Sequence, residues 1–518
     1  MTNEQLAHEL LLDPAFTLDE HGGARVEHSS PHAKIRSSFH LAFWNSLEDD
    51  LRLLPDPEYT RVARVLGEIR DGVADLASGG GAWAAAGTIS SVLDLDLVNA
   101  QIKEGAFEWA CCVRLVKGVM AVLLSFPGAD AHPHGPAAVP ASGAPAPASP
   151  EAQSPPPALA TRTWPELQAL LAGAADDATQ RPHAFCSALR FMLDYVKAVR
   201  VAVANSRLRL LAPTMKTHGV EYERSCVDKR QREAEAAGNG RSWLDCTRAW
   251  VRACVRSSCA SGSVSIADLT TLDHGKGRAF STVLLEGFVS LVTAAGAFEP
   301  AKLAETLQLD KCRFAQLHAA FRDQVSVASV LVRVQQHLCQ HKEPSPHAVL
   351  AAVQRGVDRA LLACMPPDAT LAAIVHATTA ALEAHSTVAD TQRNHFCAGL
   401  RAEMHPAGAV PRVVSARLRA LLLRAVGGPT DIYRDTDTTR AVFAELNVPQ
   451  VFALLVPKFR ATGRLLRRVV AVHMRVYAPR YNAMIPAEAG AEAGAAAQRR
   501  RWTAVVEEAL ARGVRVRA

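Results

Sequence analysis

The sequence lacks the features of secreted and membrane proteins. Its first residues, MTNEQLAHELLLDP, have no cationic start followed by an apolar run and therefore predict no signal peptide. No stretch approaches the roughly 18 uninterrupted apolar residues of a membrane-spanning helix; the best candidate, Val119 to Phe126, is far too short. The eleven cysteines include no C-x-x-C pair, which favours a reducing compartment. We therefore expect a soluble, cytoplasmic protein without a transmembrane segment.

Catalytic signatures are also missing. The sequence has no P-loop, no G-x-S-x-G, no H-E-x-x-H and no G-x-G-x-x-G after a strand. HGKGR, from His274 to Arg278, can present backbone amides to a phosphate, but an exposed glycine-rich turn before a helix is the favoured interpretation. We expect no enzyme activity, no cofactor and no small-molecule substrate.

One histidine pair has the spacing of metal ligands. In HLCQH, His337 and His341 are one helical turn apart and can share a metal, whereas Cys339 points away from their face. A third ligand is missing, and His395 with Cys397 is a weaker pair still. We therefore expect histidines that are packed or exposed rather than metal-bound.

Aromatic residues are scarce, at 6% of the chain, while Ala, Leu, Arg and Val dominate. This usage favours helices over sheets. With 49% hydrophobic residues the chain can bury a sizeable core. The sequence therefore predicts an all-α fold, a large multi-helix bundle or array.

Helical periodicity supports this prediction along the chain. The apolar row of the first long segment is Ile35, Phe39, Phe43, Leu47, Leu51 and Leu54. We expect Phe43 and Trp44 in the core rather than as exposed anchors. Later rows are Val62, Val65, Ile69 and Val73, and then Phe185, Leu189, Met192, Val196, Val199 and Val203. Further helices are predicted around 241–257, 278–296, 313–340, 346–363, 368–386, 412–426 and 441–478.

Two apolar stretches alternate as strands do. They are VSVASVLVRV from Val325 and VVAVHMRVY from Val469. Helical neighbours and the lack of hairpin turns favour helices here, with strand as the alternative.

Composition also divides the chain. Ten prolines fall between Pro127 and Thr163, which predicts a disordered Pro/Ala-rich insertion at 127–163. We therefore expect 1–126 and 164–481 to form one helical domain. An Ala/Gly-rich linker and a basic tail helix are predicted at 482–518.

Positive charge is concentrated near the end of the chain. From Val456 to Ala518 there are 13 Lys and Arg against 4 Asp and Glu, a local +9 against +6 for the whole chain. A candidate basic face consists of Arg460, Arg464, Arg467, Arg468 and Arg475. Intrachain ion pairs on a solvated face are the favoured interpretation, and a site for acidic or phosphorylated partners is the alternative.

The tail also contains Arg500-Arg501-Trp502-Thr503. Two arginines ahead of a threonine are typical of basophilic kinase substrates, and phosphate on Thr503 would add about −2 of charge beside them. Chance occurrence in an Arg-rich tail is the competing explanation.

Four ordered stretches resemble the t-complex protein eleven family. They are KIRSSFHLAFWNSLEDDL from Lys34, YTRVARVLGEIRDGV from Tyr59, LDLDLVNAQIKEGAFEW from Leu93 and LRLLAPTMKTHGVEYER from Leu208. The last ends in Val220, Glu221, Tyr222, Glu223 and Arg224. The resemblance covers the first 225 residues, and the C-terminal half matches only in helical character.

This resemblance implies an all-α, non-catalytic protein of signal transduction, linked to cyclic-AMP and protein kinase A pathways and to flagellar function. We expect an adaptor or regulator with kinase-pathway, cytoskeletal or flagellar protein partners. A helical scaffold that binds RNA or anionic membrane through its arginines is the alternative, although no nucleic-acid motif supports it.

The charged end of the fourth stretch has two interpretations. Glu221, Glu223 and Arg224 are expected to be hydrated, with Glu221 paired to Arg224 at i,i+3. A docking surface that includes Tyr222 is the alternative. Pro213 is expected to kink or end the preceding helix and so to fix the direction of that surface.

Overall fold

The computed structural model describes residues 2–18, 31–53, 58–80, 83–126, 163–237, 243–270, 276–363, 367–404, 408–428, 432, 436–446 and 449–511. Every regular element in these ranges is an α-helix or a 3₁₀-helix, and none is a strand, which confirms the all-α prediction. None of the described helices is both long enough and apolar enough to span a bilayer.

The chain divides into two compact units, Met1–Thr217 and His218–Ala518. The division lies within the long helix α8 (Arg181–Ala236), one turn after Pro213. A proline in mid-helix leaves the carbonyl four residues earlier without its helical donor. Pro213 was expected to kink or end the helix, and α8 does not end there but continues to Ala236. The sequence predicted that 1–126 and 164–481 form one helical domain, whereas the structure divides these residues into two compact units.

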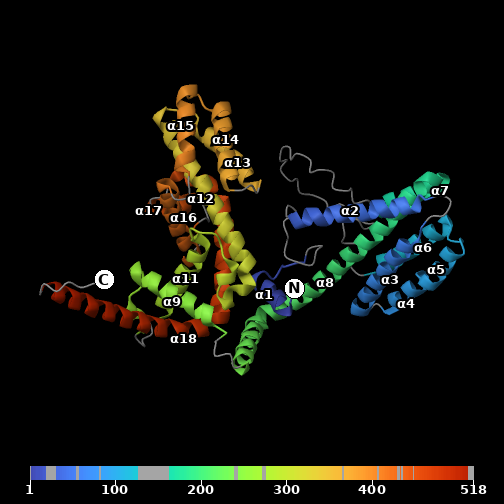
Figure 1. Ribbon diagram of the computed structural model, residues 1–518, viewed down its shortest axis with the longest axis horizontal. Helices are drawn as coiled ribbons and strands as arrows, with labels where there is room; N and C mark the ends of the chain where they lie inside the picture. Colours follow the sequence, from blue (N-terminus) through green and yellow to red (C-terminus); the bar gives the residue numbers. More distant parts are fainter. Residues whose placement is uncertain are drawn as a thin grey trace. The chain divides into compact units, whose positions relative to one another are not determined.

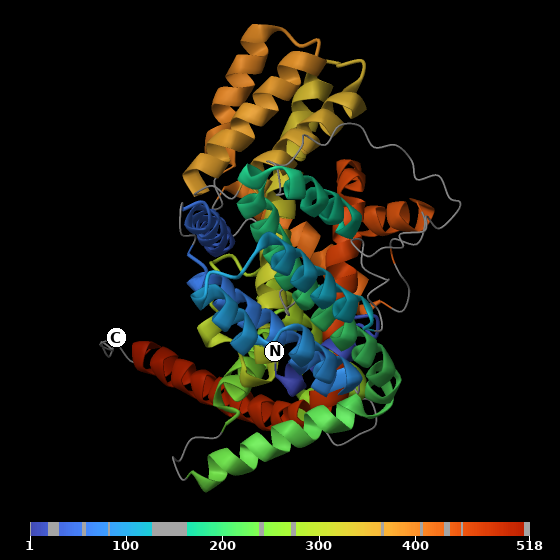
Figure 2. The same ribbon diagram turned by 90° about the vertical axis from the view of Figure 1, so that its right-hand side faces the viewer.

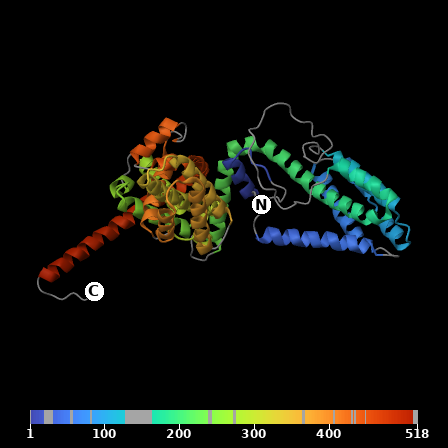
Figure 3. The same cartoon turned by 90° about the horizontal axis from the view of Figure 1, so that it is seen from above.

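The first unit consists of short helices gathered along α8 (Figures 1 and 3). In chain order they are α1 (Asn3–Leu12), α2 (Pro31–Leu51), α3 (Thr60–Gly80), α4 (Trp83–Val92), α5 (Leu95–Lys103), α6 (Trp109–Leu124), α7 (Trp164–Asp176) and the 3₁₀ turn η2 (Ala178–Gln180). Local signals fix several ends: Asp94 accepts hydrogen bonds from two amides of the first turn of α5, and Thr163 with Glu166 forms a capping box on α7.

The core of this unit is apolar. The predicted row of α3, from Val62 to Val73, is fully buried, and so are the α8 residues from Phe185 to Val199 that face it. A side chain on Gly72 would place its Cβ 2.9 Å from Val196 Cγ1, so this glycine sets the close approach of α3 to α8. The two helical rows were predicted correctly because each follows the 3.6-residue period.

Helix α2 departs from its predicted row. Trp44, Leu47 and Leu51 are buried as expected, but Phe39 is 74% exposed and Phe43 is 39% exposed. A strict i,i+4 row rotates by about 40° per step around a helix, so the row that starts at Ile35 has turned far from its first position when it reaches Leu51. The prediction that Phe43 is a core residue is wrong, and Trp44 takes that place.

The second unit comprises the end of α8 and the helices that follow it. They are α9 (Asp245–Ala260), α10 (Ile266–Thr270), α11 (Lys276–Thr293), α12 (Lys311–Gln340), α13 (Pro346–Leu362), α14 (Pro367–His385), α15 (Asp390–Glu403), α16 (Ala409–Gly427), α17 (Thr436–Glu445) and α18 (Val456–Ala511), with the 3₁₀ turns η3 (Pro300–Lys302), η4 (Glu305–Asp310) and η5 (Gln450–Leu455). Helices α13, α14 and α15 project together at one end of this unit (Figure 2).

Both stretches with alternating apolar residues are helical, since the first lies in α12 and the second in α18. The sequence periodicity did not predict α15. It predicted one helix over 441–478, where the structure has the end of α17 and the start of α18 as separate helices. Helix α18 also continues through Pro479, Pro486 and the Ala/Gly-rich segment as far as Ala511, where a linker was predicted from 482.

Several predictions lie outside the described residues. The Pro/Ala-rich insertion falls there from 127 to 162, and so do His274 and the glycine that follows it in HGKGR. The backbone at Arg500, Arg501 and Thr503 belongs to α18, but the side chains there are not among those described.

Candidate interaction surface

The clearest link within the second unit joins the end of α8 to α18. The Arg224 guanidinium donates one hydrogen bond to the Arg475 carbonyl (2.5 Å) and another to the Val476 carbonyl (3.2 Å). Residue 479 of α18 is proline, so the Arg475 carbonyl has no N–H donor four residues later. Arg224 therefore supplies the donor that the helix itself lacks.

Glu223 also points inward. It is 0% exposed, although a hydrated position was expected. Its charge lies near Tyr477, whose phenol is buried; burial first, and then the Glu223 carboxylate, raise the pKa of Tyr477 above its ordinary value of 10.0. The expectation that all three charged residues are hydrated is therefore wrong for Glu223, because this side of α8 faces α18.

The other two residues of this segment face outward. Glu221 is exposed and lies 3.7 Å from His218, rather than pairing with Arg224. Tyr222 is 40% exposed. Arg224 cannot serve Glu221 because its guanidinium is directed to the α18 backbone. The predicted docking surface thus separates into an inward pair, Glu223 and Arg224, and an outward pair, Glu221 and Tyr222.

The arginines of α18 share one helical face. Because α18 is helical throughout, Arg460, Arg464, Arg467 and Arg468 fall within an arc of about 100°. Arg464 and Arg468 are exposed, and the exposed Arg475 continues the face two turns later. Arg460 and Arg467 are half-buried, and the Nε atom of Arg460 has no hydrogen-bond partner among the described residues.

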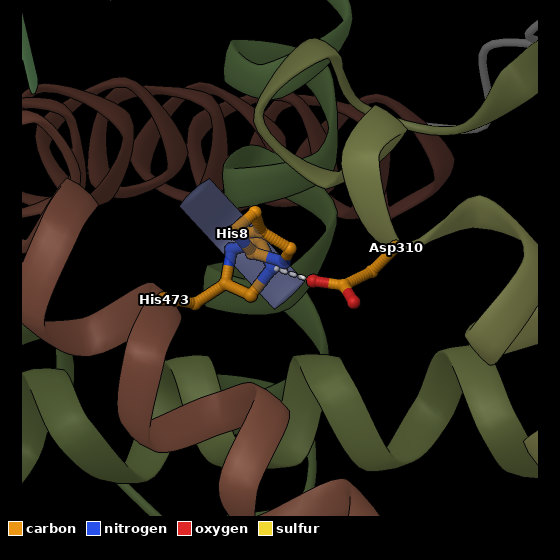
Figure 4. A group of neighbouring side chains, drawn as sticks. All are labelled: His8, Asp310 and His473. Atoms are coloured by element: carbon orange, nitrogen blue, oxygen red, sulfur yellow. Dashed lines mark hydrogen bonds and ion pairs between the residues drawn. The ribbon is translucent and has the colours of Figure 1, made fainter. Parts of the chain in front are cut away.

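The buried side of α18 includes polar contacts among its apolar residues. His473 Nε2 lies 2.8 Å from the Asp310 Oδ2 atom, and both side chains are 0% exposed (Figure 4). Asp310 also accepts a hydrogen bond from Arg313 Nη1 at 2.5 Å. Two turns later the Tyr481 hydroxyl donates to Thr306 Oγ1 at 2.9 Å. These contacts hold α18 against η4, so the arginine face is directed away from it.

Sequence reasoning missed this polar interior. His473 and Asp310 are 163 residues apart and belong to no local motif. The apolar neighbours of His473 in VVAVHMRVY were its only signal, since they predict a buried position for whatever lies between them.

Glu305 organises the neighbouring start of α9. Its carboxylate accepts hydrogen bonds from the amides of Cys246 (2.9 Å) and Thr247 (2.7 Å) and from the Thr247 hydroxyl (2.8 Å). Burial alone would raise the pKa of Glu305, but hydrogen bonds to its charged form, from its own backbone and then from Cys246 and Thr247, outweigh burial and hold the pKa below its ordinary value of 4.5. Glu305 therefore caps the α9 N-terminus with a negative charge.

The histidine pair lies at the end of α12, with His337 buried in the helix and His341 half-buried at its C-cap. His337 is buried and stacks on Phe396 of α15, with ring centroids 4.4 Å apart, while the His341 ring lies 4.7 Å away. Burial first, and then the nearby charges of His341 and Arg333, lower the pKa of His337.

Comparison with known families decides where the chain belongs. The family model described as T-complex protein 11 matches residues 6–124 and 167–486. The chain belongs to this family. No solved structure matches it.

The T-complex protein 11 match reaches further than the sequence resemblance did. It continues through the second unit to residue 486, where only general helical character was expected to agree. Both Arg224 and the arginine face of α18 lie inside the matched residues, whereas the whole Pro/Ala-rich segment 127–163 and Thr503 lie outside them.

Proposed function

We propose that this T-complex protein 11 family member is a non-catalytic adaptor or regulator that acts through protein–protein contacts in cAMP/protein kinase A-linked signalling. The proposal places it in the cytoplasm. Family membership supports the signalling role, because the resemblance to this family implies it.

The observation that carries the proposal is the exposed arginine face of α18. Arg464, Arg468 and Arg475 are exposed on a helix that buried contacts hold on another side. A row of guanidinium groups on one helical face suits recognition of acidic or phosphorylated protein segments.

Affinity purification of the full chain with mass spectrometry tests this role. The expected result is a kinase-pathway or cytoskeletal partner that is retained after nuclease treatment and is lost when Arg464, Arg467 and Arg468 are changed to Glu.

A matched control makes the same charge change outside α18. It changes three exposed arginines, Arg64, Arg401 and Arg412, to Glu and should keep the partner. An unchanged partner list in the α18 variant would contradict the assigned surface.

The same arginine face favours a second candidate, a scaffold for RNA or anionic membrane. Binding of that kind falls steeply with salt, because phosphate contacts release counterions. Capture that disappears on nuclease treatment would support RNA binding against the adaptor, and direct binding to anionic vesicles would support membrane binding.

A further inference from the structure

A groove between α13 and α14 combines a small-residue floor with a positively charged edge on α13. Its volume is about 500 Å³, and it lies between neighbouring helices of the projecting group in Figure 2. The floor is formed by alanines of both helices together with Gly356. A side chain on Gly356 would place its Cβ 3.3 Å from the Ala377 Cβ, so the two helices lie close together here.

The charged side chains that line the groove are two arginines, accompanied by two histidines. Arg355 and Arg359 follow each other at i,i+4 on α13, and His376 and His385 line the groove from α14. All four side chains are exposed, and no acidic residue is among those that line the groove. Neither arginine forms an ion pair within the described part of the chain.

The neighbouring acidic residue of α13 is engaged elsewhere. Asp358 lies 2.5 Å from Lys458 of α18, which leaves the two arginines without a carboxylate from their own helix. At the C-terminal end of α13, Leu362 is 81% exposed and adds an apolar contact point beside the arginine edge.

We propose that this groove binds an acidic amphipathic helix of a partner protein. A pair of packed helices leaves a groove that a third helix can fill. Small residues along the groove allow the axis of the third helix to approach the other two axes to about 8–10 Å. Glutamates at i,i+4 spacing on the incoming helix would match Arg355 and Arg359, while its apolar face would cover the alanine floor. This inference builds on the proposed adaptor role but uses a surface separate from α18.

The test uses the full-length protein and a labelled synthetic peptide of about 20 residues, long enough to form a helix when bound. The peptide has an alanine/leucine face flanked by glutamates at i,i+4 spacing, and fluorescence anisotropy reports binding. Changing Arg355 and Arg359 to Glu should weaken binding at least about tenfold, because each reversal replaces attraction by repulsion. Arg401→Glu with Arg412→Glu, an identical charge change at exposed sites outside the groove, should leave it within about twofold.

A bulk variant separates groove binding from general attraction. Ala380 is exposed and lines the groove. Ala380→Trp should therefore fill the groove with an indole ring while all charges remain. Peptide binding should again fall at least about tenfold. Helical content and unfolding temperature should stay unchanged in this variant. It therefore also provides the test if the arginine variant fails to fold.

Three results would overturn the inference. These are no peptide binding by the unmodified protein, equal binding of a glutamate-only peptide that forms no helix, or unchanged binding in Ala380→Trp. Stronger binding to phosphatidylserine vesicles that Arg355 and Arg359 control would assign the groove to membranes instead. If the peptide fails while the α18-dependent partner is still captured, only the groove is wrong and the adaptor role stands.

Discussion

The two units differ in the kinds of side chain that they bury. The main hydrophobic core of the first unit runs from Trp44 to Val199. Among the described residues, buried polar and charged side chains other than His8 belong to the second unit. They include Glu223, Thr306, Asp310, Gln324, Glu343, Thr462, His473 and Glu488.

This difference separates two ways of fixing a helical fold. Apolar rows fix which face of a helix is buried, and many substitutions of similar volume satisfy them. Buried polar pairs require particular partners, because a lone buried charge or hydrogen-bonding group is costly. We infer that the second unit holds its helices in one register more strictly, as a surface for specific partners needs.

The largest effect is expected at Asp310. Asp310→Ala leaves His473 and Arg313 without their shared carboxylate in a buried site and should destabilise the second unit by about 3–5 kcal/mol. Chemical unfolding with hydrogen-exchange mass spectrometry measures the loss and assigns it to a unit. Asp71→Ala, at an exposed aspartate, is the control and should cost less than about 0.5 kcal/mol. If Asp310→Ala also cost less than about 0.5 kcal/mol, the buried polar contacts would not distinguish the second unit from the first.

In the first unit, the volume of the buried side chains should determine the free energy of unfolding. Leu189 is fully buried in the apolar core, and Leu189→Ala should cost about 2–5 kcal/mol through the cavity it leaves. Met192→Leu, which roughly conserves volume at a neighbouring buried site, should cost less than about 1.5 kcal/mol. The same unfolding measurement applies. Equal losses of unfolding free energy in the two variants would show that this apolar core tolerates a volume-conserving substitution no better than a cavity.

A double-mutant cycle sharpens the role assigned to Arg224. Arg224→Ala should cost about 1–3 kcal/mol, because the Arg475 carbonyl then has no donor. Pro479→Ala restores the helical N–H to that carbonyl, so Arg224→Ala should cost clearly less in the Pro479→Ala background. The unfolding free energies of the four proteins give the coupling. Additive losses would mean that Arg224 acts in some other way.

The smallest effect concerns acid stability. The pKa of Glu305 is lower in the folded chain than its ordinary value of 4.5, so its charge stabilises the fold above about pH 4.5 and this contribution is lost as the pH falls. Glu305→Gln should therefore be less stable than the unmodified protein at pH 7, and the gap should narrow toward pH 3. Glu299→Gln, at an exposed carboxylate, is the control. Parallel stability curves for Glu305→Gln and the unmodified protein would contradict the cap.

Sequence reasoning succeeded where a local period controls the structure. The apolar rows of α3 and α8 were located correctly, and so was Trp44. It failed at Phe43, because an i,i+4 row drifts around the helix, and at Glu223, because charge predicts exposure only until a distant helix packs against it. The pairing of Arg224 with α18 spans about 250 residues, and only the folded chain reveals it.

The two candidate surfaces differ in how much of them a sequence can indicate. The helical spacing of the α18 arginines is a local pattern and predicts a shared face, whereas the groove between α13 and α14 depends on how two helices pack. The residue pattern of one helix does not indicate how it packs against another. In the sequence, the alanines that line the groove look like ordinary residues that favour a helix.

Hydrogen-exchange mass spectrometry of the full chain, with and without its captured partner, tests most directly whether the second unit carries the binding surfaces. We predict slower exchange in the first turns of α18 or in α13 and α14, with the apolar core of the first unit unchanged. Protection confined to the first unit, up to Thr217, would contradict this assignment.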